Sequence, residues 1–122
     1  MSVKQNMSND GKIMHLSVTG RFDYKITKEF RNSYNKTASH KGITYYINLN
    51  NTSYIDSSAL GILLLLRECA KHNAGRVIIE QPSEQVNQVL KVANFEKLFT
   101  INQTRSKPDL VIVKNERLNK SS

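Results

Sequence analysis

The residues best suited to chemistry are two neighbouring serines, Ser57 and Ser58, which directly follow the carboxylate of Asp56. Asp is a favoured N-cap, because its side chain accepts hydrogen bonds from the free amides of a first helical turn. The apolar run 62–66 follows closely, so we expect a helix to begin after Asp56. The dipole and free N–H groups of a helix N-terminus favour negative charge. A serine there is well placed to carry a phosphate.

The geometry of this expected helix separates the two serines. At about 100° per residue, one side collects a set of apolar residues that we expect to be buried: Ile62, Leu65, Leu66, Cys69 and Ala70. Ser58 points toward that side, whereas Ser57 projects among exposed residues with Leu60 and Leu64. We therefore expect only Ser57 to be accessible to a kinase, beside two leucines that form the apolar centre of a binding patch.

A purely structural interpretation of the same residues remains open. Asp56 would simply cap the helix, the serines would be tolerated in its first turn, and Leu60 would pack under a neighbouring loop. The helix geometry taken alone favours this interpretation over a binding patch.

Other reactive side chains do not form a recognisable catalytic or metal-binding arrangement. His15, His40 and His72 fall on different expected elements, with no Cys or carboxylate at metal-ligand spacing. Neither a glycine-rich phosphate loop nor a Gly-x-Ser-x-Gly motif occurs. Cys69 projects toward the expected core and is interpreted as a packing residue. We expect no catalytic residue, no metal and no cofactor, so the protein would be a substrate of enzymes rather than an enzyme.

The elements that must position the serines follow from hydrophobic periodicity. Alternating apolar residues predict strands near 14–18 and 43–49, and a compact apolar run predicts another at 76–80. Spacing of i, i+4 predicts a helix from about 26 to 37, and Pro82 opens a third helix after the one that begins at Asp56. Short strands are expected near 3–7 and 98–101, and 50–53 reads as a turn-like linker. This alternation predicts an α/β fold with a mixed sheet of about four to five strands and about four helices.

Size and charge set further limits. The 122 residues suit one domain, expected over 1–102, with 103–122 as a basic C-terminal extension or tail. The formal net charge of +8 is high, but the basic residues are dispersed, so we expect no nucleic-acid partner. We expect a cytoplasmic protein, because the sequence has one cysteine and no apolar leader. We expect no membrane association, because its longest apolar run is too short to cross a bilayer.

Several motifs, in the right order, resemble one known family. The segment 56–61, Asp-Ser-Ser-Ala-Leu-Gly, resembles the Asp-Ser-Ser-(Gly/Ala)-Leu-Gly motif of STAS domains in bacterial anti-sigma-factor antagonists. The steps at 20–23, 75–82 and 92–99 also resemble the family's pattern, so the similarity covers roughly residues 3 to 102. The resemblance implies a STAS fold.

The resemblance also implies a phosphorylation-controlled partner switch. The first serine after the Asp is the family's phosphoacceptor, which corresponds to Ser57, with Ser58 as second choice. The unphosphorylated form would bind a serine-kinase anti-sigma factor or a response-regulator kinase or phosphatase, phosphorylation would release it, and a serine phosphatase would reset it. Such proteins regulate transcription and, in some bacteria, biofilm formation and motility. The expected partner-binding residues are Asp23, Asp56, Ser57, Leu60, Gly61 and Leu64, although Asp23 also reads as a helix N-cap.

Two other functions stay open at this stage. A STAS subunit could dock permanently on a transport ATPase complex, although the intact Asp-Ser-Ser counts mildly against that role. A basic nucleic-acid-binding domain is permitted by the charge, but no motif supports it, and a steep salt dependence of affinity would identify it.

Overall fold

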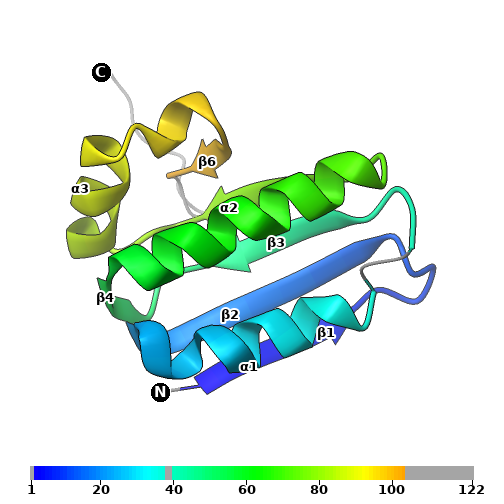
Figure 1. The fold of residues 1–122 in the computed structure, drawn as a ribbon, viewed down its shortest axis with the longest axis horizontal. Helices are drawn as coiled ribbons and strands as arrows, with labels where there is room; N and C mark the ends of the chain where they lie inside the picture. The colour runs from blue at the N-terminus through cyan, green and yellow to red at the C-terminus, as the bar shows by residue number, and fades with distance from the viewer. Residues whose placement is uncertain (1, 38–39, 104–122) are drawn as a thin grey trace, which may run out of the picture.

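A six-stranded mixed sheet with helices packed against it forms the domain in the computed structural model, which describes residues 2–37 and 40–103 (Figure 1). The elements are, in chain order, β1 (Ser2–Met7), β2 (Ile13–Phe22), α1 (Tyr24–Asn35), β3 (Thr44–Asn48), β4 (Thr52–Ile55), α2 (Ser57–His72), β5 (Arg76–Glu80), α3 (Glu84–Val92), the 3-10 helix η1 (Phe95–Lys97) and β6 (Thr100–Asn102).

The ten-residue strand β2 organises the sheet, because it pairs with three other strands. The strand order is β1-β2-β3-β5-β6, and only the β1–β2 pair is antiparallel. The first half of β2 pairs with β3, and its last residues pair with β4 after a register shift at Gly20. Gly20 has a φ of 88° there, a backbone conformation that favours glycine. Through this second pairing, β4 lies beside the end of β2, off the main strand order, and leads directly into α2.

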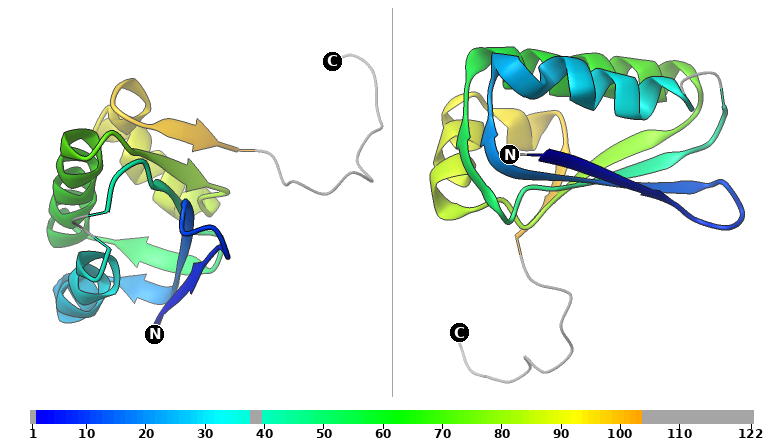
Figure 2. Two further views of the ribbon diagram at one scale, coloured as in Figure 1. Left: turned by 90° about the vertical axis from the view of Figure 1, so that its right-hand side faces the viewer. Right: turned by 90° about the horizontal axis from the view of Figure 1, so that it is seen from below.

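Helices α1 and α2 lie side by side on one face of the sheet, while α3 packs near β4 at the end where both of them begin (Figures 1 and 2). Their apolar faces close a continuous core with the strands. The largest side chains that are fully buried are Phe22, Phe30, Leu16, Ile43, Ile47, Leu49, Leu63, Leu66, Ile79 and Leu90.

Gly75 follows α2 at a point where two backbones approach closely. The helix ends at His72, and the left-handed residue behind it is Ala74, with a φ of 60°. A Cβ on Gly75 would overlap the carbonyl oxygen of Ile43. That carbonyl accepts the Arg76 amide at 3.1 Å, so the missing side chain lets β5 begin beside β3.

The predicted α/β class and STAS fold are confirmed, and β5 matches the predicted 76–80. The described residues hold three α-helices and one 3-10 helix, and six strands where four or five were predicted. The additional strand is β4, which begins inside the predicted linker 50–53 and extends beyond it to Ile55. The last strand is 100–102 rather than 98–101, and the predicted tail beyond 103 lies outside the described residues.

Candidate functional site

The β2–β4 register brings the beginnings of two helices together. Phe22 pairs with Ile55 in parallel strands, and both side chains are buried. The next residue in each strand is therefore an aspartate at the same end of the sheet: Asp23, the N-cap of α1, and Asp56, the N-cap of α2. The amide of Asp56 continues the strand pairing by donating to the Phe22 carbonyl at 3.2 Å.

Asp56 holds the N-termini of both helices. Its Oδ1 accepts a hydrogen bond from the Ala59 amide at 2.9 Å, within its own helix. Its Oδ2 accepts one from the Tyr24 amide at 3.2 Å, in the first turn of α1. One carboxylate thus satisfies donors that each helix would otherwise leave without a partner, next to the positive ends of both dipoles.

Asp23 is the more buried of the two caps, with only 5% of its surface exposed. Its Oδ1 accepts from the Lys25 amide at 3.0 Å, and its Oδ2 lies 3.4 Å from the Arg21 Nε. The structure therefore bears out the N-cap interpretation of Asp23. Whether Asp23 also touches a partner stays a prediction.

Ser57 and Ser58 are both exposed in the first turn of α2. The expectation that Ser58 points into the core is wrong, so accessibility does not distinguish the two serines. With Asp56 capping Ala59, the amides of both serines lack an acceptor within the helix. Within the part of the chain that the structure describes, the Ser57 side chain makes no hydrogen bond, so it has no structural task there.

The apolar side chains of α2 are distributed differently from the sequence expectation. Leu60 and Leu64 are partly buried and pack against the core, whereas Leu65, expected to be buried, is 50% exposed. The buried stripe contains Ala59, Ile62, Leu63, Leu66 and Ala70, so it is rotated toward Leu63. Gly61 is partly buried and has open space around its Cα, because a Cβ added there would meet no atom within 4 Å.

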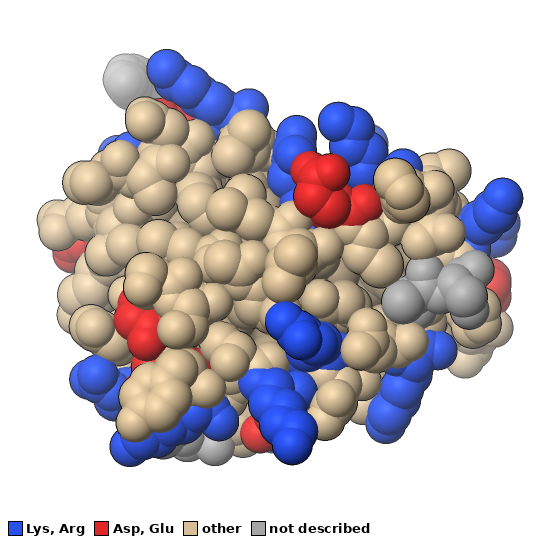
Figure 3. Space-filling view, viewed as in Figure 1, with Lys and Arg blue, Asp and Glu red and all other residues tan. Residues whose placement is uncertain are grey.

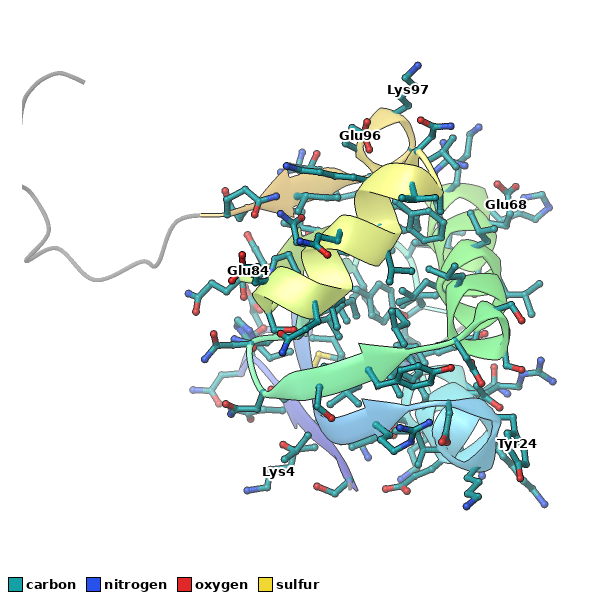
Figure 4. All side chains as sticks on the ribbon, turned by 90° about the vertical axis from the view of Figure 1, so that its left-hand side faces the viewer. Lys4, Tyr24, Glu68, Glu84, Glu96 and Lys97 are labelled. Atoms are coloured by element: carbon teal, nitrogen blue, oxygen red, sulfur yellow. The ribbon has the colours of Figure 1, made fainter. Side chains whose placement is uncertain are left out.

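Two exposed tyrosines near the serines were not predicted. Tyr24 is 66% exposed and Tyr54 is 42% exposed, and Figure 4 shows Tyr24 pointing away from the body of the protein. Tyr54 pairs with Arg21 across β4 and β2, which places the Arg21 guanidinium 4.0 Å from the centre of its ring. Aromatic and arginine side chains of this kind are enriched in protein interfaces. No periodic signal in the sequence located them, since the burial of β4 does not alternate and Tyr24 is brought here by the pairing of β2 with β4.

The histidines and the cysteine do not gather at one place in the described residues. His15, His40 and His72 are exposed on separate elements, and Cys69 is partly buried against the core. Across residues 2–37 and 40–103, no group of three or more His, Cys, Asp or Glu residues is placed to hold a metal ion. None of the described helices is long and apolar enough to cross a membrane.

Comparisons with known proteins assign a family and a fold. A family model described as the STAS domain matches residues 4–107. A STAS-domain containing protein of Pseudomonas aeruginosa (strain UCBPP-PA14) is 38% identical over 104 residues, which is 83% of this chain and 99% of that protein.

Solved structures agree in fold at low sequence identity. An anti-sigma-factor antagonist (STAS) domain protein from Planctomyces limnophilus has a TM-score of 0.72 at 13% identity, over 84% of this chain and 91% of that one. The anti-sigma factor antagonist SpoIIAA in its unphosphorylated form has a TM-score of 0.69 at 19% identity, over 85% of this chain and 90% of that one. The Bacillus SpoIIAA structure in the phosphorylated form has a TM-score of 0.66 at 19% identity, over 82% of this chain and 90% of that one.

Proposed function

This chain belongs to the STAS-domain family, and we propose that it is a regulatory binding protein whose complex with a partner is ended by phosphorylation of Ser57. The observation that carries the proposal is the exposed Ser57 at the first position of α2, on a surface that the cap Asp56 makes rigid. Because the Ser57 side chain is exposed and makes no hydrogen bond in the described residues, it is available for modification.

The proposed binding surface consists of Ser57, Gly61 and Leu65 along the first nine residues of α2, with Tyr24 of α1 and Tyr54 of β4 near its start. Its aromatic and leucine side chains supply apolar area, and Gly61 lets a partner backbone approach the helix closely. Figure 3 shows that residues other than Lys, Arg, Asp and Glu cover most of the face that carries α1 and α2, with Lys and Arg side chains and some Asp and Glu side chains scattered among and around them. The formal net charge of +8 suits a partner with an acidic contact surface.

Phosphate on Ser57 would break the complex without unfolding the protein. A phosphoserine adds about 1.5 to 2 negative charges at pH 7. The amides of Ser57 and Ser58, which have no acceptor within the helix, and the dipole of α2 would stabilise that charge in the free protein. In the complex the same charge would be desolvated against apolar groups and would lie next to the carboxylate of Asp56. The phosphate therefore favours the free form.

The partner that best fits this role is a serine kinase of the anti-sigma-factor type or a response-regulator kinase or phosphatase, with a serine phosphatase restoring the unmodified form. The 19% identical SpoIIAA is known in both an unphosphorylated and a phosphorylated form, which supports the choice of a switch by phosphorylation. In this proposal the chain is a cytoplasmic substrate and regulator, and it performs no catalysis itself.

The test is a co-purification from the native cytoplasm with phosphosite mapping, using Ser57→Ala, Ser57→Asp and Ser58→Asp. Ser58→Asp is the matched control, because both serines are exposed and both lie in the first turn of α2. We expect wild type and Ser57→Ala to retain a partner that Ser57→Asp loses, with Ser58→Asp retaining it at least in part. Phosphate should map to Ser57.

Two outcomes would contradict this function. If all variants hold the same partner and Ser57 is never modified, permanent docking on a transport complex becomes the better account. If phosphate maps to Ser58 and Ser58→Asp alone releases the partner, the switch exists but the assignment of the phosphoacceptor is wrong.

A further inference from the structure

A cavity of about 200 Å³ lies between the second half of α2 and the strands β5 and β6. Arg67 and Lys71 of α2, Arg76 of β5 and Thr100 of β6 line it, and Leu98 supplies an apolar wall. Three cations and a hydroxyl group therefore come together from two consecutive elements, α2 and β5, and from the more distant strand β6. The cavity is separate from the proposed switch, since Ser57 and Arg67 are ten residues apart on one helix, about 15 Å along its axis.

The cations of this cavity are not neutralised equally. Arg67 is fixed in the wall, since its Nε donates to the Leu98 carbonyl at 2.8 Å and its Nη1 contacts the Glu68 carboxylate at 3.0 Å. Within the described residues, no carboxylate lies at ion-pair distance from Lys71 or Arg76. A site with excess positive charge, partly enclosed, attracts anions more strongly than an open surface does.

The dipole of α2 accounts for the position of Lys71 but not for that of Arg76. Lys71 lies in the last turn of α2, where a cation is favoured by the negative end of the dipole. Arg76 is the first residue of β5, outside the helix, so the dipole gives no reason for its presence. Thr100 on the neighbouring strand adds a hydroxyl donor, and arginine is suited to two-pronged recognition of phosphate.

We propose that this cavity binds the phosphoryl group of a small phosphate monoester or of free phosphate, through Lys71, Arg76 and Thr100. The volume decides the class of ligand. Sites for drug-sized molecules occupy roughly 300 to 1,000 Å³, so a cavity of about 200 Å³ suits a phosphoryl group with little attached to it. None of the described residues that line the cavity is aromatic, so a base has no ring to stack on and a nucleotide is disfavoured.

The test is an NMR titration of the whole chain with inorganic phosphate and, separately, with O-phosphoserine, at constant ionic strength. Arg76→Gln is the main variant, because Arg76 is exposed and its loss does not open the core. Lys28→Gln on α1 is the matched control, since it removes one exposed charge away from the cavity. We expect saturable shifts at the amides of Gly75, Val77 and Thr100, and roughly tenfold weaker binding for Arg76→Gln.

The two ligands distinguish the sources of the phosphoryl group. Tighter binding of O-phosphoserine indicates a monoester, and equal binding indicates free phosphate. The proposal is overturned if no saturation occurs, if the shifts fall elsewhere, or if Arg76→Gln and Lys28→Gln weaken binding equally. If Lys71 only interacts favourably with the dipole of α2, Lys71→Gln should be less stable than wild type but should bind phosphate with unchanged affinity. That result would overturn the assignment of Lys71 to the phosphate site.

Discussion

Asp56 is expected to stabilise the domain through two hydrogen bonds that reach two different helices. Replacing it with Ala removes the cap on Ala59, which costs about 1 kcal/mol. It also removes the acceptor of the Tyr24 amide. We assign about 0.5 to 1 kcal/mol to that second bond, at the low end for hydrogen bonds because it is partly exposed to water. Asp56→Ala should therefore lower the free energy of unfolding by about 1.5 to 2 kcal/mol.

The substitution Asp56→Asn divides this effect, because an amide has only one oxygen to accept a hydrogen bond. It can serve Ala59 or Tyr24, but not both, so we expect a loss of about half that of Asp56→Ala. Urea unfolding measures the midpoint, and an unchanged slope shows that the change is in stability alone. For a domain of this size, the Ala variant should also melt roughly 10 °C lower.

Ser57→Ala is the matched control for the cap, because the neighbouring Ser57 side chain makes no hydrogen bond in the described residues. Its free energy of unfolding should lie within about 0.5 kcal/mol of wild type. Amide hydrogen exchange adds a local readout: Asp56→Asn should lose protection at Tyr24 or at Ala59. The reasoning is refuted if Asp56→Ala unfolds at the same midpoint as Ser57→Ala, or if exchange at both amides is unaltered.

Three other predictions concern buried and exposed positions. Burial raises the pKa of Tyr45 above 10.0, so its phenol contributes stability that is full below pH 10 and is lost as the pH rises through the raised pKa. We expect Tyr45→Phe to flatten this decline when the free energy of unfolding is measured in urea at several pH values. An unchanged dependence of that free energy on pH would disprove the prediction. Gly75→Ala should cost about 1 to 3 kcal/mol, whereas Gly61→Ala should be neutral or stabilising by up to about 1 kcal/mol, and the reverse order in urea melts would contradict the structure. Leu65→Ala should weaken partner binding with little change in stability, whereas Leu63→Ala should cost about 2 to 5 kcal/mol; a Leu65→Ala variant with full affinity in a binding assay would exclude Leu65 from the surface.

Local patterns in the sequence predicted most elements, because the responsible interactions are local. The spacing of Ile26, Phe30 and Tyr34 describes the buried face of α1, and all three are buried. The compact run at 76–80 is β5 itself. β4 was missed because its burial follows no alternation, with Thr52 and Ile55 inside and the two residues between them outside. Its pairing with β2 is a contact between distant parts of the chain, which periodicity does not reveal.

The site was predicted in part, for a related reason. Asp56 and Ser57 were located correctly, since a cap and a first turn are local features. The orientation of Leu60 and Leu65 was wrong, because the buried side of α2 depends on what packs beside it. A helical-wheel projection assumes that one side of the helix is buried and the other exposed, and it contains no information about neighbouring helices. Tyr24 was missed because only the β2–β4 register brings it to Asp56.

The separate roles of Asp56 and Ser57 have an evolutionary consequence. Asp56 carries hydrogen bonds to both helices, so its replacement is penalised in every descendant that must fold. Ser57 carries none in the described residues, so selection can remove or restore this proposed phosphoacceptor by one substitution without a loss of fold. If Ser57 is the switch, as we propose, a lineage could convert a reversible regulator into a permanent binding subunit, or back again, while the scaffold stays constant. In that proposal, regulation and foldability are inherited through adjacent but independent positions.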